Sequence, residues 1–147
     1  MPLFLKGDNM RVQVNAHLTR EAEAIRRAVF MEEQGFVNEF DQIDDISVHI
    51  VLFDGDIPAA VCRVYYCEER ECHVIGRIAV QKTMRGKHLG AEVLRAAEEY
   101  IASQGGSKAM LSAQVRAAGF YERSGYIQTD ERYDDEGCPH AWMQKSL

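Results

Sequence analysis

The sequence has no apolar run close to the roughly 20 residues that a membrane-spanning helix requires. Of its 147 residues, 46% are hydrophobic and 27% are charged, which is the composition of a globular protein. The beginning of the chain carries Lys6, Asp8 and Arg11 and lacks the apolar core and cleavage site of a secretory signal. We therefore expect one domain over residues 1–147, without a membrane segment and located in the cytoplasm.

Basic residues are also scarce, because 17 Lys and Arg stand against 23 Asp and Glu and the net charge is -6. This balance argues against a nucleic-acid partner, which needs a basic surface. The acidic residues gather in two blocks, residues 32–45 and residues 130–136. Such blocks are usually solvated loops, although they also attract cationic substrates toward a cleft.

Several chemical signatures are missing. The four cysteines include no CxxC pair and the five histidines have no HxxxH spacing, so we predict no metal centre and expect buried or incidental thiols. The first three cysteines are five residues apart, which on one strand would place neighbours on opposite faces. The phosphate loop GxxxxGK[ST], the dinucleotide fingerprint GxGxxG and the nucleophile elbow GxSxG are absent as well.

The first half of the chain predicts a strand, a helix and a hairpin. The helix lies between Thr19, a good N-cap, and Gly35, a common helix end. The hairpin turns at Asp54-Gly55, a pair that readily takes positive φ angles. Residues 36–47 have no clear period and predict a loop or a short irregular helix. The strands are expected at residues 11–18, 48–53 and 57–66, and the helix to about residue 34.

The second half predicts a strand, helix and strand unit, which by its length forms a right-handed parallel pair. Gly76 in the first of these strands indicates a bulge or the close approach of another backbone. The expected elements are strands at residues 72–80 and 108–113 around a helix beginning near residue 88, then a short helix at 115–125 and strands at 126–129 and 140–147 around an acidic loop. The predicted fold class is a single α/β domain with a mixed sheet, antiparallel in its N-terminal strands and with a central parallel pair flanked by helices.

The turn Arg85-Gly86-Lys87-His88-Leu89-Gly90 precedes the central helix. A helix N-terminus offers unpaired N–H groups and a positive dipole end, and Arg85 and Lys87 add positive charge. Gly86 and Gly90 allow a ligand to approach the backbone. The turn is therefore compatible with a diphosphate, although an ordinary basic helix start has the same appearance.

Residues 80–91 resemble the [RQ]xxGx[GA] acyl-CoA loop of the GNAT superfamily of N-acetyltransferases. The stretch "QVRAAGFYERSGY" from Gln114 to Tyr126 resembles the family's NxxAxxFYxxxGF helix at the correct distance downstream. The segments "RRAVFMEEQG", "DQIDD" and "GCPHAWM" are similar to small stand-alone bacterial members of the ElaA type. His88 stands where the loop often has glycine, which fits only if its backbone needs no positive φ. Gln114 replaces the Asn that opens the second motif but keeps an amide.

The resemblance implies a GNAT fold, acetyl-CoA as cofactor and direct acetyl transfer to a primary amine of a small molecule or exposed peptide. It also implies that a pantetheine arm lies between two splayed strands, where a backbone N–H stabilises the thioester oxygen. The cofactor-binding residues that it implies are Ile78, Ala79, Val80, Arg85, Gly86, Lys87, His88, Leu89, Gly90, Ala91, Gln114 and Phe120. Family members of this size often dimerise, so a homodimer is compatible with the resemblance.

Transfer needs a proton acceptor for the amine and a proton donor for the leaving thiolate. The resemblance assigns the donor to Tyr121. For the acceptor we favour His140, with His49, Glu33 or water as alternatives. Glu32, Glu33 and Gln34 lie where the family's first helices border the acceptor amine and are candidate substrate contacts.

Two other functions are compatible with the same loop. An acyl-CoA-binding regulatory module would keep the cofactor residues without efficient transfer and would not need Tyr121. A synthase of acyl-homoserine lactone type would need a larger acyl pocket. The sequence alone does not specify the acceptor.

Overall fold

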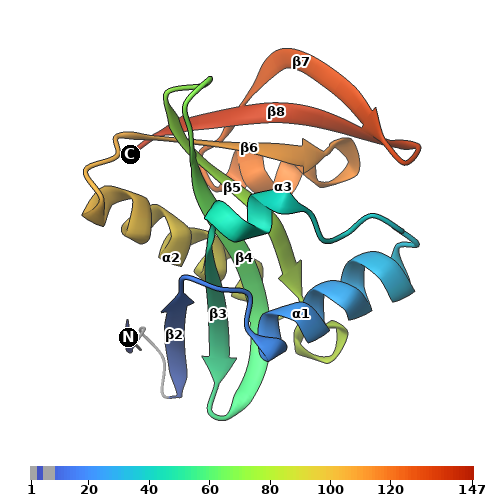
Figure 1. Cartoon of the computed structure of the whole chain (residues 1–147), viewed down its shortest axis with the longest axis vertical. Coiled ribbons are helices and arrows are strands. Elements are labelled where there is room, and N and C mark those ends of the chain that lie inside the picture. The colour runs from blue at the N-terminus through green and yellow to red at the C-terminus, as the bar shows by residue number, and fades with distance from the viewer. Residues whose placement is uncertain (1–2, 5–8) are drawn as a thin grey trace.

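The computed structural model describes residues 3–4 and 9–147. An eight-stranded sheet runs through it in the order β1-β2-β3-β4-β5-β6-β8-β7 (Figure 1). Within the described chain β5 and β6 pair in parallel and the other neighbours pair antiparallel. The strands are β1 (Leu3–Phe4), β2 (Met10–Asn15), β3 (Val48–Asp54), β4 (Ile57–Cys67), β5 (Cys72–Val80), β6 (Lys108–Gln114), β7 (Ile127–Asp135) and β8 (Cys138–Ser146). The predicted mixed sheet with one central parallel pair is confirmed.

Helices cover both faces of this sheet. On β3, Ile50 and Leu52 belong to the hydrophobic core that includes α2, whereas Val51 and Phe53 belong to the core that includes α1. Because neighbouring strand residues point to opposite faces, α1 and α2 lie on opposite sides. The helices are α1 (Arg20–Arg26), η1 (Arg27–Glu33), η2 (Gln42–Ile46), η3 (Lys82–Met84), α2 (Leu89–Ser103), η4 (Val115–Ala117) and α3 (Ala118–Arg123). No helix in the described part of the chain is long and apolar enough to cross a membrane.

The first helix begins and ends where the sequence predicts. The Thr19 hydroxyl accepts a hydrogen bond from the Ala22 N–H at 3.2 Å, and Gly35 follows the helix with φ of 83°. The sequence did not predict that its second half, η1, is a π-helix, a rare geometry that often marks functional sites. Its C-cap is Gln34, which lies in the candidate site described below.

The prediction of an acidic loop near the C-terminus is wrong. β7 continues through the acidic residues to Asp135, and Pro139 already belongs to β8. Only Glu136 and Gly137 connect the strands, and their φ angles of 50° and 81° are those of a tight hairpin turn. The prediction failed because it treated the charges as a loop signal. β7 is an edge strand, and charged side chains are common on sheet edges because they hinder further pairing.

All four cysteines are free thiols; Cys62 and Cys72 are buried, and Cys67 and Cys138 are half-buried. The inference that neighbouring cysteines lie on opposite faces of one strand is wrong for Cys67 and Cys72. They end β4 and begin β5, and the hairpin places them directly opposite each other.

Candidate active site

The parallel pair β5 and β6 separates soon after it forms. Pairing covers only His73–Ile75 on β5 and Ala109–Leu111 on β6, and the two strands then diverge (Figure 1). From Gly76 onward, the backbone of β5 therefore has no strand partner on the β6 side. This opening leaves peptide groups free for an extended ligand.

A bulge lies at the same point of β5. Val61 pairs with Ala79 and Arg63 with Gly76, so that two residues, Arg77 and Ile78, stand opposite one residue of β4. The predicted bulge is confirmed, but the residue in the left-handed conformation is Arg77, with φ of 54°, and not Gly76. A Cβ at Gly76 would lie 3.6 Å from Nε of Arg63, which is an ordinary van der Waals contact, so neither the backbone conformation nor the space requires a glycine there.

Two cavities meet at this opening. The first, which we call the loop cavity, has a volume of about 600 Å³ and lies between β5, the start of α2 and α3. The second, the strand cavity, has a volume of about 170 Å³ and lies between β5, β6, the end of η1 and the β7–β8 hairpin. We call their meeting point the junction; the residues that line both cavities are Gln34, Ile78, Ala117 and Tyr121.

The turn that enters α2 offers unpaired backbone donors. Glu92 donates the first helical hydrogen bond, to the His88 carbonyl at 3.2 Å, and no acceptor in the described chain meets the N–H groups of residues 86–91. The loop cavity is lined here by Arg85, Gly86 and residues 88–91. Donors of this kind at a helix N-terminus fit a phosphate group.

The family loop was expected to fit only if the backbone of His88 needs no positive φ, and the structure contradicts this condition. The φ of His88 is 60° and its ψ is 25°, so the backbone is left-handed at the position where the family often has glycine. A non-glycine residue pays about 1 kcal/mol or more for this conformation, although His tolerates it better than most residues. The loop therefore keeps the glycine-like geometry without the glycine.

The charged residues of the turn differ in their position. The Arg85 guanidinium forms two hydrogen bonds with the Glu33 carboxylate, the longer at 2.8 Å, and these lower the pKa of Glu33. Arg85 lines the loop cavity, whereas Lys87 is exposed and lies outside its lining. Leu89 is buried, with 6% of its surface exposed, and packs in the main core as well as lining the cavity.

An aromatic row forms the α3 side of the junction. Phe120 and Tyr121 are edge to face with ring centroids 4.9 Å apart, and Tyr126 follows at 6.2 Å from Tyr121. A Cβ on Gly90 would be 3.2 Å from Cζ of Phe120, so the absence of a side chain at Gly90 lets this row approach α2. Burial raises the pKa of Tyr121 and keeps the phenol protonated. Its hydroxyl has no hydrogen-bond partner among residues 9–147, whereas that of Tyr126 donates to Glu98 at 2.8 Å.

The strand cavity contains the favoured proton acceptor. His140 lines it, is 8% exposed and stacks on Tyr133 with centroids 5.2 Å apart. Nδ1 of His140 lies 2.9 Å from the Cys138 carbonyl, which can only accept. Nδ1 therefore carries the hydrogen, and Nε2 is left with the lone pair that a base needs.

The amide residues connect the two sides of the opening. Gln114 lines the strand cavity and donates to the side-chain oxygen of Gln34 at 2.8 Å. Arg116 donates to the Gln114 side-chain oxygen, also at 2.8 Å. Arginine has no acceptor, so this bond determines which way the Gln114 amide is turned. Gln34 is thus the candidate substrate contact that the structure places at the junction.

Other candidates lie elsewhere. Glu32 is exposed and lines neither cavity, and Glu33 is paired with Arg85 beside the loop cavity. His49 is buried, with 1% exposed, and lies within 3.0 Å of the Asp44 carbonyl outside both cavities. Burial lowers the pKa of His49.

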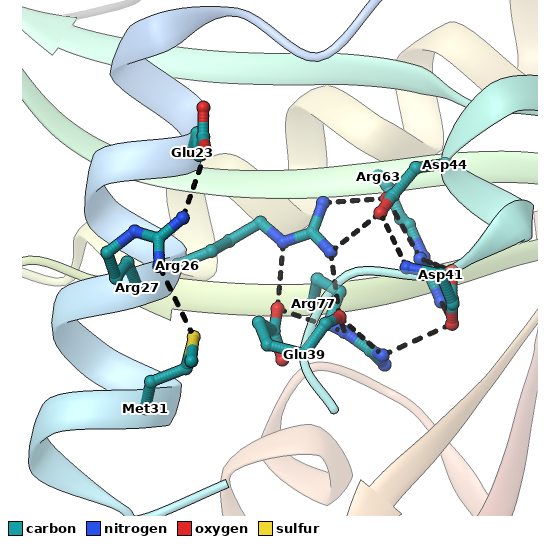
Figure 2. Close-up of polar contacts among 9 residues, drawn as sticks. All are labelled: Glu23, Arg26, Arg27, Met31, Glu39, Asp41, Asp44, Arg63 and Arg77. Atoms are coloured by element: carbon teal, nitrogen blue, oxygen red, sulfur yellow. Dashed lines mark hydrogen bonds and ion pairs between the residues drawn. The ribbon is translucent and has the colours of Figure 1, made fainter. Parts of the chain in front are cut away.

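A cluster of three arginines and three carboxylates was not predicted (Figure 2), and two of its members, Arg77 and Glu39, line the strand cavity. The expectation of solvated acidic loops is wrong for Glu39 and Asp44, which are 4% and 8% exposed. Burial raises the pKa of Glu39 despite two guanidinium partners, whereas in Asp44 the hydrogen bonds from Arg26 and Arg63 outweigh burial and hold the pKa well below its usual range. No sequence signal identifies these pairs, because the arginines stand 13 to 38 residues from their partners along the chain. The cluster consists of Arg26, Arg63, Arg77, Glu39, Asp41 and Asp44.

A mixed sheet that opens beside a bulged strand, with a helix N-terminus at the opening, is the acyl-CoA N-acyltransferase fold. The profile of the acetyltransferase (GNAT) domain matches residues 13–147. The chain therefore belongs to the GNAT acetyltransferase family, and the resemblance seen in the sequence is confirmed.

The relatives are small proteins of similar length. The uncharacterized N-acetyltransferase YjcF of Bacillus subtilis is 31% identical over 134 residues, which are 89% of this chain and 94% of YjcF. The crystal structure of ElaA from Escherichia coli has a TM-score of 0.78 at 26% identity and covers 92% of this chain and 99% of its own. An acetyltransferase from B. subtilis solved in complex with CoA has a TM-score of 0.73 at 15% identity over 94% of this chain and 99% of its own, which is a likeness of fold.

Proposed function

We propose that the protein is an acetyl-CoA-dependent N-acetyltransferase that moves an acetyl group directly to a primary amine of a small molecule or of an exposed peptide. The observation that carries this proposal is the junction, where a cavity with unpaired N–H donors meets a second cavity at Tyr121. The likeness of fold to an acetyltransferase solved with CoA supports the choice of cofactor.

The residues present fit CoA. The N–H groups of residues 86–91 would hold the pyrophosphate, and Phe120 would provide an apolar wall of the loop cavity. Peptide groups of residues 78–80 on the open side of β5 would hold the acetyl-pantetheine end near Gln114, where the Val80 carbonyl accepts a hydrogen bond from Nε of Arg85 at 3.2 Å in the absence of ligand. Acetyl-CoA supplies an activated thioester when bound.

Two side chains would then move protons. Tyr121 lines both cavities, and its phenol would give its proton to the departing sulfur. Nε2 of His140 would accept the proton of the attacking amine, directly or through water. Glu33 is the weaker candidate because Arg85 stabilises its charged form and lowers its basicity.

The acceptor amine would enter through the strand cavity past Gln34. Glu32 and Glu33, the other proposed substrate contacts, lie outside this cavity and would act only at its approach. We keep a cytoplasmic location and a homodimer as further proposals, the latter to be tested by light scattering.

The test is incubation of the protein with acetyl-CoA and a panel of polyamines, aminosugars, amino acids and peptides. Because the chain has four free cysteines, acetylated products should be followed by mass rather than with a thiol reagent. We expect acetyl-CoA to raise the melting temperature and at least one amine to gain an acetyl group. Binding without transfer across the panel would favour a regulatory module, and absence of binding would refute the proposal.

A further inference from the structure

The cluster of arginines and carboxylates surrounds the bulge of β5. Nε of Arg77 lies 3.0 Å from the Glu39 carboxylate, and Nη2 of Arg77 donates to the Glu39 carbonyl at 3.0 Å. Arg26 contacts the same Glu39 carboxylate from α1 at 2.8 Å. Figure 2 shows Glu39 between these two guanidinium groups. The bulge is thereby connected to the first helix through one buried carboxylate.

The other side of the bulge is held as well. Nη2 of Arg77 lies 3.3 Å from the Asp41 carboxylate, which in turn lies 2.6 Å from Nη1 of Arg63. Arg63 is on β4 directly opposite Gly76, and its Nε is buried without a partner in the described chain. The side chain of Arg77 therefore connects the bulge to α1 through Glu39. It also connects the bulge to Arg63 of β4 through Asp41.

The backbone of Arg77 is left-handed, and the contacts of its side chain hold it in this conformation. A left-handed φ is unfavourable for a side-chain-bearing residue by about 1 to 2 kcal/mol, and such a conformation persists only where surrounding contacts determine it. The ψ angle of Arg77 sets the plane of the peptide that carries the Ile78 N–H. Ile78 lies at the junction, beside Tyr121.

We propose that Arg77 and Glu39 are positioning residues, which hold the left-handed bulge so that the Ile78 N–H points at the reacting carbonyl oxygen. This inference rests on the proposed function. Neither side chain needs to touch the acetyl group, because a donor to a developing negative charge depends on orientation, and a displacement of about 1 Å can cost about a hundredfold in rate.

Arg77→Gly separates the left-handed backbone conformation from the guanidinium contacts with Glu39 and Asp41, because glycine takes a positive φ freely but carries no guanidinium. We expect the Ile78 amide of the unliganded protein to shift in its NMR spectrum also in Glu39→Gln, which leaves both covalent neighbours of Ile78 unchanged. We expect kcat to fall about tenfold to a hundredfold while the Kd for CoA stays within about threefold. Arg77→Lys, which keeps the charge but not the fork of donors, should recover part of kcat and carries the test if the glycine variant does not fold.

Glu71→Gly is the matched control. Glu71 has φ of 53°, is exposed and lies in the β4–β5 turn at the far end of β5 from the bulge. It should leave kcat, CoA affinity and the Ile78 amide unchanged.

A kcat equal to that of wild type in both Arg77 variants, with an unchanged Ile78 amide in Glu39→Gln, would overturn this inference and leave the proposed function standing. A loss of CoA affinity in proportion to kcat would also overturn it, because the cluster would then be a general structural support. A wild-type protein that transfers no acetyl group would refute the proposed function, and this inference with it.

Discussion

Replacing Tyr121 by Phe removes one oxygen from the junction and leaves the ring. The ring contacts Phe120 and lies edge to face with Tyr126, and the change affects neither contact. The hydroxyl has no hydrogen-bond partner among residues 9–147, so its removal leaves no donor or acceptor unpaired. We therefore expect the free energy of unfolding to change by about 0.5 kcal/mol or less.

The catalytic effect should be large by comparison. A positioned general acid contributes about 10² to 10⁴ in rate, which is about 2.7 to 5.4 kcal/mol at 1.36 kcal/mol per tenfold change. Since burial raises the pKa of Tyr121, the phenol stays protonated well above neutral pH, and loss of this acid should lower kcat equally across the neutral range. The Kd for acetyl-CoA should stay within about threefold, because the wall of the loop cavity is unchanged.

Tyr126→Phe is the matched control in the same aromatic row. The Tyr126 hydroxyl is buried and donates to the Glu98 carboxylate at 2.8 Å, away from both cavities. Its loss should cost about 1.5 to 3 kcal/mol of stability and lower the melting temperature by about 3 to 12 °C, with kcat unchanged below that temperature. Steady-state kinetics and thermal melts of both variants are the assay. A kcat for Tyr121→Phe within about threefold of wild type would remove Tyr121 as the acid.

Three further predictions concern the loop cavity, the base and the buried cluster. Gly90→Ala places a Cβ 3.2 Å from Cζ of Phe120, so it should weaken acetyl-CoA binding in calorimetry with little change in kcat; unchanged affinity would contradict the close approach. His140→Gln should lower kcat by about 10² or more while the Kd for acetyl-CoA stays within about threefold, and an unchanged kcat would remove His140 as the base. Asp44→Asn should cost about 3 to 5 kcal/mol in denaturant unfolding at neutral pH. Because the folded pKa of Asp44 is lowered, its contribution is full above the ordinary Asp value of about 4 and is lost as pH falls below it, so wild type and variant should converge in acid.

Most of the fold could be predicted because its signals are local. Thr19 as a cap, Gly35 as a helix end and the apolar stripe of α2 each depend on residues a few positions apart. The acidic end of β7 was misread because an exposed edge strand has no buried face to give it an apolar alternation.

The site was predictable where it depends on the backbone and not where it depends on long-range contacts. The turn at residues 85–91 could be located from its basic residues and glycines, and Tyr121 from the resemblance to the family motif; the structure brings both to the loop cavity. The pairing of Arg77 with Glu39 spans 38 residues and depends on a left-handed bulge residue that has no sequence signature. Glu33 illustrates the same limit, because its partner Arg85 is 52 residues away.

The most direct test of the central claim is an NMR titration of the unliganded protein with CoA, following the backbone amides. We predict progressive shifts for residues 78–80 at the edge of β5 and for residues 86–91 in the turn that enters α2, and none for the β4–β5 turn at residues 68–71, at the far end of β5. Absence of shifts at residues 86–91 at saturating CoA, or shifts confined to another surface, would contradict the account.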